Sequence, residues 1–155
     1  MRVNDLMKRP PITCDVNDTL ERAAHLMWEN DVGAVIIVRE DGRMTGIITD
    51  RDICMSAFLQ GRVLSDLLVH SAMATHVVSI HPEQPIEDAE QLMTAHQLHR
   101  IPVVDEEQHP LGILTLNDIA RESVDPDTAM KQGRARVANV LAAIARPRDP
   151  NRVAA

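Results

Sequence analysis

Aromatic residues are nearly absent from this sequence, which contains one Trp, one Phe and no Tyr. Proteins that bind single-stranded nucleic acids stack the bases on aromatic side chains, and Trp28 and Phe58 alone are too few for such a surface. The formal net charge is −7, and residues 1–123 carry about −10 because residues 124–155 hold six Lys or Arg against three Asp. An acidic surface repels phosphate backbones, so we exclude nucleic acid as a partner.

Long apolar runs and a recognisable signal sequence are also missing. No apolar stretch reaches the roughly 18 residues of a membrane span, and the start MRVNDLMKRP has no apolar signal core. The two cysteines, Cys14 and Cys54, lack CxxC spacing. We expect both to be small buried hydrophobic residues in a reducing compartment, although spacing alone leaves a disulfide open. These features predict a cytoplasmic protein without membrane contact.

Patterns typical of catalytic and metal centres are missing as well. The sequence has no nucleophile elbow and no paired acid and base in a recognisable context, so we predict that it is not an enzyme. Among seven histidines, His96 and His99 would share one helix face if a helix extended that far. Gln97-Leu98 indicates a helix end before His99, so we predict no metal site and no required cofactor.

What the sequence does contain is an internal repeat. With 155 residues, 45% of them apolar, one compact unit is expected. A shift of 66 positions aligns residues 3–55 with residues 69–121 without a gap. The identical pairs include Val3/Val69, Met7/Met73, Gly46/Gly112, Thr49/Thr115 and Asp52/Asp118. Two copies of one supersecondary unit are therefore predicted.

Each copy divides into helices and strands by its apolar period. Apolar residues at helical spacing predict helices over 20–27, with Asp18 and Glu21 as a capping box, and over 86–93, with Pro85 at the first helical position. Short apolar runs predict strands over 34–38 and 44–48, joined by the turn Asp41-Gly42, and over 101–104 and 111–114. A second helix begins at Thr49 in one copy and at Thr115 in the other, and a short strand near Ile12 and Val78 leads each copy.

The predicted fold class is therefore α+β, with two β-α-β-β-α repeats packed face to face through their sheets. The predicted segments are repeat 1 over residues 1–60, a helical connector over 61–68, repeat 2 over 69–123 and a helical tail over 124–155. The tail carries an apolar stripe from about Arg134 until Pro147 ends it. We expect that stripe to pack on the module or on a second subunit, the alternative being a frayed appendage.

The strings GIITDRDI (46–53), GILTLNDI (112–119) and HRIPVVD (99–105), together with the repeat order, resemble the CBS domain, whose tandem pairs are called Bateman modules. The resemblance covers about residues 3–123 and is closest to stand-alone bacterial CBS pairs. It implies a regulatory sensor that binds AMP, ADP, ATP or a related adenosyl ligand in the cleft between the repeats. It also implies dimerisation through helices and a regulated protein of unknown identity. A dimeric interaction scaffold with empty ligand sites is the alternative.

The resemblance implies roles for the Gly-x-x-Thr-x-x-Asp motif. Asp52 and Asp118 would accept hydrogen bonds from ribose hydroxyls, while Thr49 and Thr115 would reach phosphate or sugar oxygens. Free N–H groups at a helix start favour an anion there. The glycines would keep the strand free of a side chain near the ligand. The same Thr-x-x-Asp spacing also suits a capping box that needs no ligand.

The resemblance further implies that His99 and Arg100 bind phosphate, as a similar pair does in the regulatory subunit of AMP-activated protein kinase. A guanidinium suits phosphate oxygens, although a surface ion pair with a Glu is the commoner role of an Arg. Gly33 and Ala34 are the matched residues, so we predict one strong site in repeat 2 and a weaker or empty one in repeat 1. Arg51, whose counterpart is Asn117, is a further candidate.

The purine would lie among aliphatic side chains and bond to strand backbone. The candidates for the aliphatic contacts are Val35, Ile36, Ile80 and Ile101, and those for the backbone contacts are Thr13, Cys14, Ser79 and Ile80.

Overall fold

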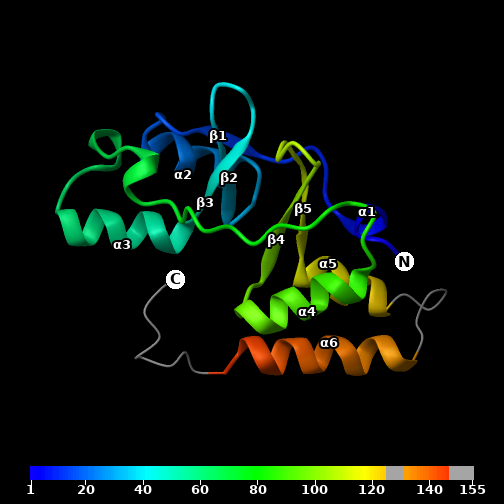
Figure 1. Ribbon diagram of the computed structural model, residues 1–155. Coiled ribbons are helices and arrows are strands. Elements are labelled where there is room, and N and C mark those ends of the chain that lie inside the picture. The colour runs from blue at the N-terminus through cyan, green and yellow to red at the C-terminus, as the bar shows by residue number, and fades with distance from the viewer. Residues whose placement is uncertain (125–130, 147–155) are drawn as a thin grey trace. The chain divides into compact units, whose positions relative to one another are not determined.

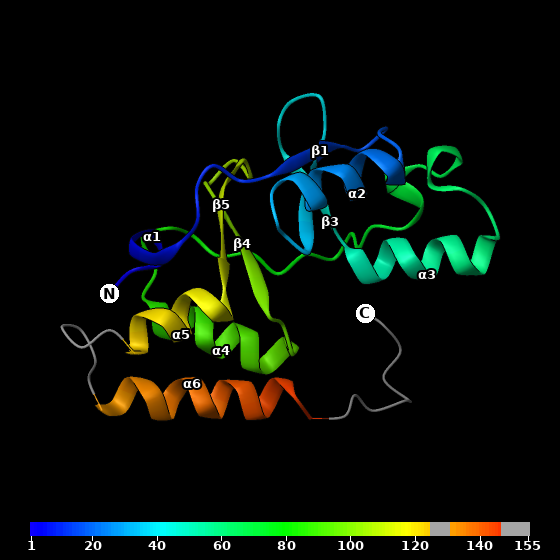
Figure 2. The same cartoon turned by 180° about the vertical axis from the view of Figure 1, so that it is seen from behind.

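The computed structural model describes residues 1–124 and 131–146 and divides into two compact units. Unit 1 contains Met1–Arg9, Val78–Asp105 and the chain from Leu111 onward, and unit 2 contains Pro10–Val77 and Glu106–Pro110. Figure 1 and, from behind, Figure 2 show helices and small sheets in both units. This mixture confirms the predicted α+β class.

Unit 2 is built on a three-stranded sheet of order β1-β2-β3. Strand β1 (Thr13–Asp15) runs parallel to β2 (Ala34–Val38), which pairs antiparallel with β3 (Met44–Thr49). Helices α2 (Leu20–Glu29) and α3 (Asp50–Gln60) follow β1 and β3. After Gly61, whose φ of 60° ends α3, the 3₁₀ turns η1 (Leu64–Asp66) and η2 (Val69–Ser71) complete the unit. The turn η1 lies within the segment predicted as a helical connector.

Unit 1 repeats this plan around strands β4 (Arg100–Val104) and β5 (Pro110–Thr115). Helix α1 (Val3–Leu6) comes from the chain start, while α4 (Ile86–His96) and α5 (Leu116–Val124) flank the strands in sequence. Ile80 bridges to Val103 in parallel, where the leading strand near Val78 was expected. Helix α4 ends at His96 because Gln97 adopts a φ of 53°, which confirms the predicted helix end.

The C-terminal helix α6 (Lys131–Ile144) covers α4 and α5 (Figures 1 and 2). Val140 and Ile144 are buried in the core of unit 1, and the side-chain amide of Gln97 donates to the Arg146 carbonyl at 3.2 Å. The tail therefore packs on the module, one of the two placements predicted for its apolar stripe. Residues 125–130 and 147–155 of the predicted tail lie outside the described residues.

The predicted capping box of Asp18 and Glu21 is wrong. Thr19 is the N-cap of α2, and its side chain accepts a hydrogen bond from the Arg22 N–H at 3.2 Å. The Asp18 carboxylate instead accepts from the Asp15 N–H at 3.0 Å and from the Cys14 thiol at 3.2 Å. It thus holds the turn between β1 and α2 rather than the helix start. Pro85 likewise is the N-cap of α4 and not its first residue.

The two cysteines differ in environment, and both are free thiols. Cys14 is 3% exposed on β1, as predicted, but Cys54 is exposed on α3, so its predicted burial is wrong. Helix α3 buries Ile53 and turns the next residue outward. Burial, followed by the hydrogen bond to Asp18, raises the pKa of the Cys14 thiol to about 12.

Each unit is completed by the leading segment of the other repeat. Lys8 of repeat 1 pairs with Ile113 of β5 through two backbone hydrogen bonds, of 2.9 and 3.2 Å. Ala74 of repeat 2 pairs with Ile47 of β3 in the same way, at 2.9 and 3.0 Å. The pairings are related by the 66-residue shift, as are the Val3 N–H bond to the Gln84 carbonyl and the Val69 N–H bond to the Asp18 carbonyl. The repeats have thus exchanged equivalent segments.

The glycines of the repeat motif are where the exchanged segments cross. A Cβ on Gly112 would lie 2.6 Å from the Lys8 carbonyl oxygen and 3.1 Å from the Met7 sulfur. A Cβ on Gly46 would lie 2.9 Å from the Ala74 carbonyl oxygen and 2.7 Å from the Met73 sulfur. The space a Cβ would take is filled by the protein's own chain, which requires glycine at both positions without any ligand.

Alanine at either glycine is expected to lower the free energy of unfolding by about 1–3 kcal/mol, because the crossing backbone must shift. Chemical denaturation of Gly112→Ala and Gly46→Ala measures this loss. Gln91→Ala, at an exposed position of α4, is the control and should stay within about 0.5 kcal/mol of wild type. Wild-type stability in both glycine variants would contradict the close crossing.

Folded protein at pH 8 is expected to react with a thiol-labelling reagent at Cys54 only, since the thiolate is the reactive form. Mass spectrometry should find one label per folded chain and two per chain unfolded in denaturant. The raised pKa of Cys14 also sets the pH dependence: its contribution to stability is complete below about pH 9 and falls as the pH rises toward 12. Rapid labelling of Cys14 in the folded protein would contradict its burial.

Candidate functional site

The two Thr-x-x-Asp motifs adopt the same geometry. The Asp52 carboxylate accepts from the Thr49 N–H at 2.9 Å and from the Thr49 hydroxyl at 2.7 Å, and the Thr49 hydroxyl accepts from the Asp52 N–H at 3.2 Å. The corresponding distances for Thr115 and Asp118 are 3.0, 2.5 and 3.2 Å. Each motif is therefore a reciprocal helix cap, the ligand-independent role that its spacing allows.

These caps use most of the N–H groups expected to hold a phosphate. At the start of α3, the N–H groups of Asp50, Arg51 and Asp52 all have acceptors within the protein. At the start of α5, the Leu116 N–H donates to the His99 carbonyl and the Asp118 N–H to Thr115. The expectation of a phosphate held by free helix-start N–H groups is therefore wrong for α3, where Asp50 and Asp52 also place two carboxylates in the first turn.

Asp118 differs from Asp52 in that two cations contact its carboxylate. Its side chain is 7% exposed, and its Oδ1 accepts from the Arg121 guanidinium at 2.7 Å and lies 3.7 Å from the Lys8 ammonium. Neither cation was predicted from the sequence. The spacing of Arg121, one helical turn after Asp118, was an available signal. Lys8 gave none, because it reaches Asp118 only through the exchanged segment.

A backbone hydrogen bond links His99, next to Arg100 in the sequence, to the start of the helix that carries Asp118. Arg100 begins β4, and the His99 carbonyl accepts from Leu116 at the first turn of α5, at 2.9 Å. Arg100 is half-buried, and no ion pair joins it to any side chain that the structure describes. The surface ion pair that composition favoured for it is thus absent from the described side chains.

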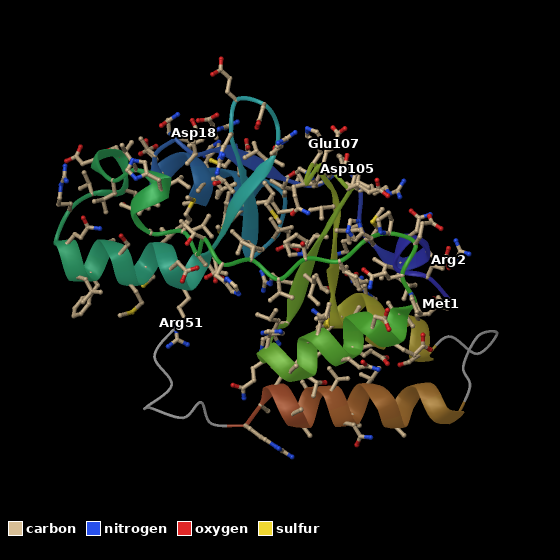
Figure 3. The ribbon with its side chains drawn as sticks, viewed as in Figure 1. Met1, Arg2, Asp18, Arg51, Asp105 and Glu107 are labelled. Carbon is tan, nitrogen blue, oxygen red and sulfur yellow. The ribbon has the colours of Figure 1, made fainter. Side chains whose placement is uncertain are left out.

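Arg51 lies in the other unit, with Thr49 and Asp52. Figure 3 shows its side chain projecting from the first turn of α3, and it is exposed. Unit 2 also holds two of the predicted strand contacts, Thr13 and Val35. Cys14 and Ile36 also lie in unit 2, and the other predicted residues lie in unit 1, namely Ser79, Ile80, His99, Arg100, Ile101, Thr115 and Asp118.

The aliphatic residues predicted to contact a purine lie in the cores. Val35 is fully buried in unit 2, while Ile80 and Ile101 are 1% and 0% exposed in unit 1, and Ile36 is 1% exposed. Both backbone groups of Ile80 are paired, the N–H with Pro102 and the carbonyl with Val104. Thr13 and Ser79 are half-buried at the strand starts. Contact between these residues and a purine stays a prediction.

The described residues offer little for a metal or a membrane. Within them, no three His, Cys, Asp or Glu side chains gather in a way that could hold a metal ion. His99 lies beyond the end of α4, so it does not share a helix face with His96. None of the helices in the described ranges is both long and apolar enough to cross a membrane.

A largely apolar cavity of about 670 Å³ lies between α2 and α3 within unit 2. Trp28, which is 87% exposed, forms part of its wall, and Asp31 and Asp50 are its acidic lining residues. The other lining residues are Ala24, Met27, Val32, Gly33, Ile53, Cys54, Ala57 and Leu64. The corresponding helices of unit 1, α4 and α5, are covered by α6 instead.

Solved structures share this fold. The CBS domain pair of protein MJ0100, solved with 5′-methylthioadenosine and S-adenosyl-L-methionine, matches with a TM-score of 0.71 and 30% identity over 78% of this chain and 94% of that chain. The CBS domain protein PAE2072 of Pyrobaculum aerophilum, solved with AMP, has the same fold with a TM-score of 0.73 and 22% identity over 92% of this chain and 99% of that chain.

Sequence relatives agree with the structures. The CBS domain-containing protein YhcV of Bacillus subtilis is 39% identical over 127 residues, which is 82% of this chain and 89% of YhcV. Several other relatives are longer, and some of these are enzymes of which this chain spans about a fifth to a quarter. The profile of the CBS domain matches residues 3–57 and again residues 65–125. With two such repeats covering most of its length, the chain belongs to the CBS domain family.

Proposed function

We propose that this protein is a regulatory module that binds an adenosine nucleotide or a related adenosyl ligand and catalyses no reaction itself. The observation that carries the proposal is the clustering of Thr115, Asp118, His99 and Arg100 in unit 1. The hydrogen bond between the Leu116 N–H and the His99 carbonyl joins the start of α5 to the residues that begin β4. The Asp118 carboxylate and the Arg100 guanidinium, for which the described side chains provide no ion-pair partner, therefore belong to one structural unit.

These groups suit the two polar parts of a nucleotide. The Asp118 carboxylate would accept hydrogen bonds from the ribose hydroxyls, and the half-buried Arg100 would donate charge-assisted hydrogen bonds to phosphate oxygens. His99, which is exposed, would add a further donor. Thr49, Asp52 and Arg51 would form a second, weaker site in unit 2, because Gly33 and Ala34 replace the His-Arg pair there.

A related CBS pair supports an adenosyl ligand. The CBS domain pair of MJ0100 is 30% identical to this chain and was solved with two adenosyl compounds. Neither compound carries a phosphate, so this relative supports the adenosyl part of the proposal, while Arg100 supports the phosphate. A cytoplasmic location and an unknown regulated protein remain predictions that accompany this function.

Calorimetric titration of the wild type with AMP and ATP is expected to show saturable binding, and the native protein should gain thermal stability with each added increment of ligand. Arg100→Ala should weaken binding by about 10- to 150-fold, because a hydrogen bond between charged groups contributes roughly 1.5–3 kcal/mol. Asp118→Asn should weaken it similarly by replacing a charged acceptor.

Asp52→Asn is the matched control for Asp118→Asn, since both change the carboxylate of an equivalent cap. It should affect the tighter site less, and thermal melts check that all three variants fold. If no adenosine compound binds to the wild type, the proposed function is wrong. If Arg100→Ala and Asp118→Asn bind as tightly as wild type, the assigned site is wrong.

A second candidate function, a dimeric interaction scaffold, is favoured by the cavity between α2 and α3. Its counterpart in unit 1 is covered by the amphipathic helix α6, whereas Trp28 leaves a large apolar surface exposed in unit 2. We infer that a second copy of this chain is the occupant, because the resemblance to CBS domain pairs implies dimerisation through helices. Covering Trp28 and the apolar cavity wall would remove apolar area from water. The sensor and scaffold functions are compatible in one protein.

Sedimentation velocity over a range of concentrations is expected to show a wild-type dimer, and Trp28→Ser should raise its dissociation constant tenfold or more, since buried Trp residues dominate many interfaces. Glu21→Ser, at an exposed position of α2 outside the cavity wall, is the control and should leave the dimer unchanged. A wild type that is monomeric at every concentration, or an unaffected Trp28→Ser dimer, would contradict this interface.

A further inference from the structure

The caps of α3 and α5 share one scaffold but differ in charge. In unit 2, the Asp52 carboxylate bonds only to Thr49 among the described residues, through its Oδ2, which leaves its Oδ1 open. In unit 1, the Oδ1 of Asp118 is held by Arg121 and Lys8. Because the hydrogen bonds of the two caps agree within 0.2 Å, the cations are not needed to build the cap.

The positions of the two cations confirm that they are additions to a common framework. Lys8 corresponds by the 66-residue shift to Ala74, and both pair with the equivalent strand residue. Arg121 corresponds to Met55, which is 43% exposed. At each place unit 2 has a neutral residue. The excess of positive charge is therefore specific to unit 1, where Arg100 adds a third cation.

Lys8 and Arg121 both have N–H donors beyond those that contact Asp118. Their side chains are 55% and 67% exposed, while the carboxylate that they share is 7% exposed. The guanidinium has five N–H donors, of which the structure uses one on Asp118 and one, at 3.3 Å, on the Asn117 carbonyl. Two positive charges facing one negative charge leave a net positive charge that solvent and solutes can reach.

A ribose hydroxyl that binds Asp118 Oδ1 would share this oxygen with Arg121 and weaken the 2.7 Å hydrogen bond between them. An uncharged adenosyl compound would bind the Asp118 carboxylate but would offer Arg121 no new anionic acceptor. A ligand that carries an anionic group near its ribose would give Arg121 and Lys8 new acceptors as they give up part of their contact with Asp118. The protein would then discriminate between ligands by their charge, and the discrimination is the difference between its affinities for the anionic and the uncharged compound.

We propose that Lys8 and Arg121 are the specificity-determining residues of unit 1 and select a phosphorylated adenosine over an uncharged adenosyl compound. This inference rests on the proposed function, which it deepens by naming the ligand class. It also gives a role to the exchanged leading segment, since Lys8 brings a charge from repeat 1 to the carboxylate of repeat 2.

The test uses the residues that unit 2 already carries at the equivalent places, Ala74 and Met55. Calorimetric titrations with AMP, and with uncharged 5′-methylthioadenosine, compare wild type with Lys8→Ala and Arg121→Met. Each substitution should weaken AMP binding about tenfold, because a charge-assisted hydrogen bond is lost. Binding of 5′-methylthioadenosine should stay within about twofold of wild type or become tighter, since its competitor for Asp118 is removed.

Arg62→Ala, an exposed Arg in unit 2, is the control for a general change in net charge and should alter neither affinity. Added NaCl should weaken AMP binding more in wild type than in Arg121→Met. Equal losses for both ligands, or no loss for AMP, would overturn the selectivity while leaving the proposed function intact. If neither compound binds to the wild type, the proposed function fails and this inference fails with it.

Thermal melts separate binding from folding in both variants. Lys8→Ala removes an exposed ammonium and keeps the backbone pairing with Ile113, so the exchanged segment should stay in place. If Arg121→Met unfolds, Arg121→Gln is used in its place, because glutamine keeps hydrogen-bonding capacity without the charge. A variant that changes the melting temperature but keeps the wild-type ratio of the two affinities would show a purely structural role for these cations.

Discussion

The backbone pairing of Lys8 with Ile113 and of Ala74 with Ile47 is the contact on which both units depend, because each pairing adds the missing edge to a small sheet. A sheet of two or three strands has little apolar surface to bury by itself. The leading segments supply Val3 and Val69, both fully buried, together with Met7 and Met73. Neither repeat is therefore a complete folding unit as a continuous piece of chain.

This exchange explains features that seemed to concern a ligand. Gly46 and Gly112 lack a side chain because a neighbouring backbone passes within about 3 Å of where Cβ would be. The Thr-x-x-Asp motifs bind their own helix starts first, and they present at most one carboxylate oxygen to anything else. A site that is built from such saturated groups favours ligands that replace every contact they displace.

The two repeats share their caps and strand pairings and differ in the residues around them. The caps and the strand pairings are kept, while charge is added around Asp118 and left out around Asp52. The helical faces diverge too, since α6 covers α4 and α5 whereas α2 and α3 leave Trp28 exposed. A duplicated framework thus carries two different surfaces, one suited to an anion and one to an apolar partner.

The local order of helices and strands could be determined from the sequence, because the apolar period is a short-range property and the 66-residue repeat supplies a second copy of each signal. The positions of Thr49, Thr115 and the tail helix followed from the same signals. The role of Asp18 was missed because its carboxylate can satisfy several neighbouring N–H groups, and its choice depends on the turn geometry. The exposure of Cys54 was missed because it depends on which face of α3 packs against the unit.

Only the tertiary structure decided which segment completes which sheet, since backbone hydrogen bonds between distant residues leave no trace in composition or spacing. It therefore also decided that Lys8 meets Asp118, more than a hundred residues later in the chain. The sequence by itself determined the repeat, its elements and the residues that distinguish one copy from the other, because those depend on neighbours along the chain. Their partners depend on neighbours in space.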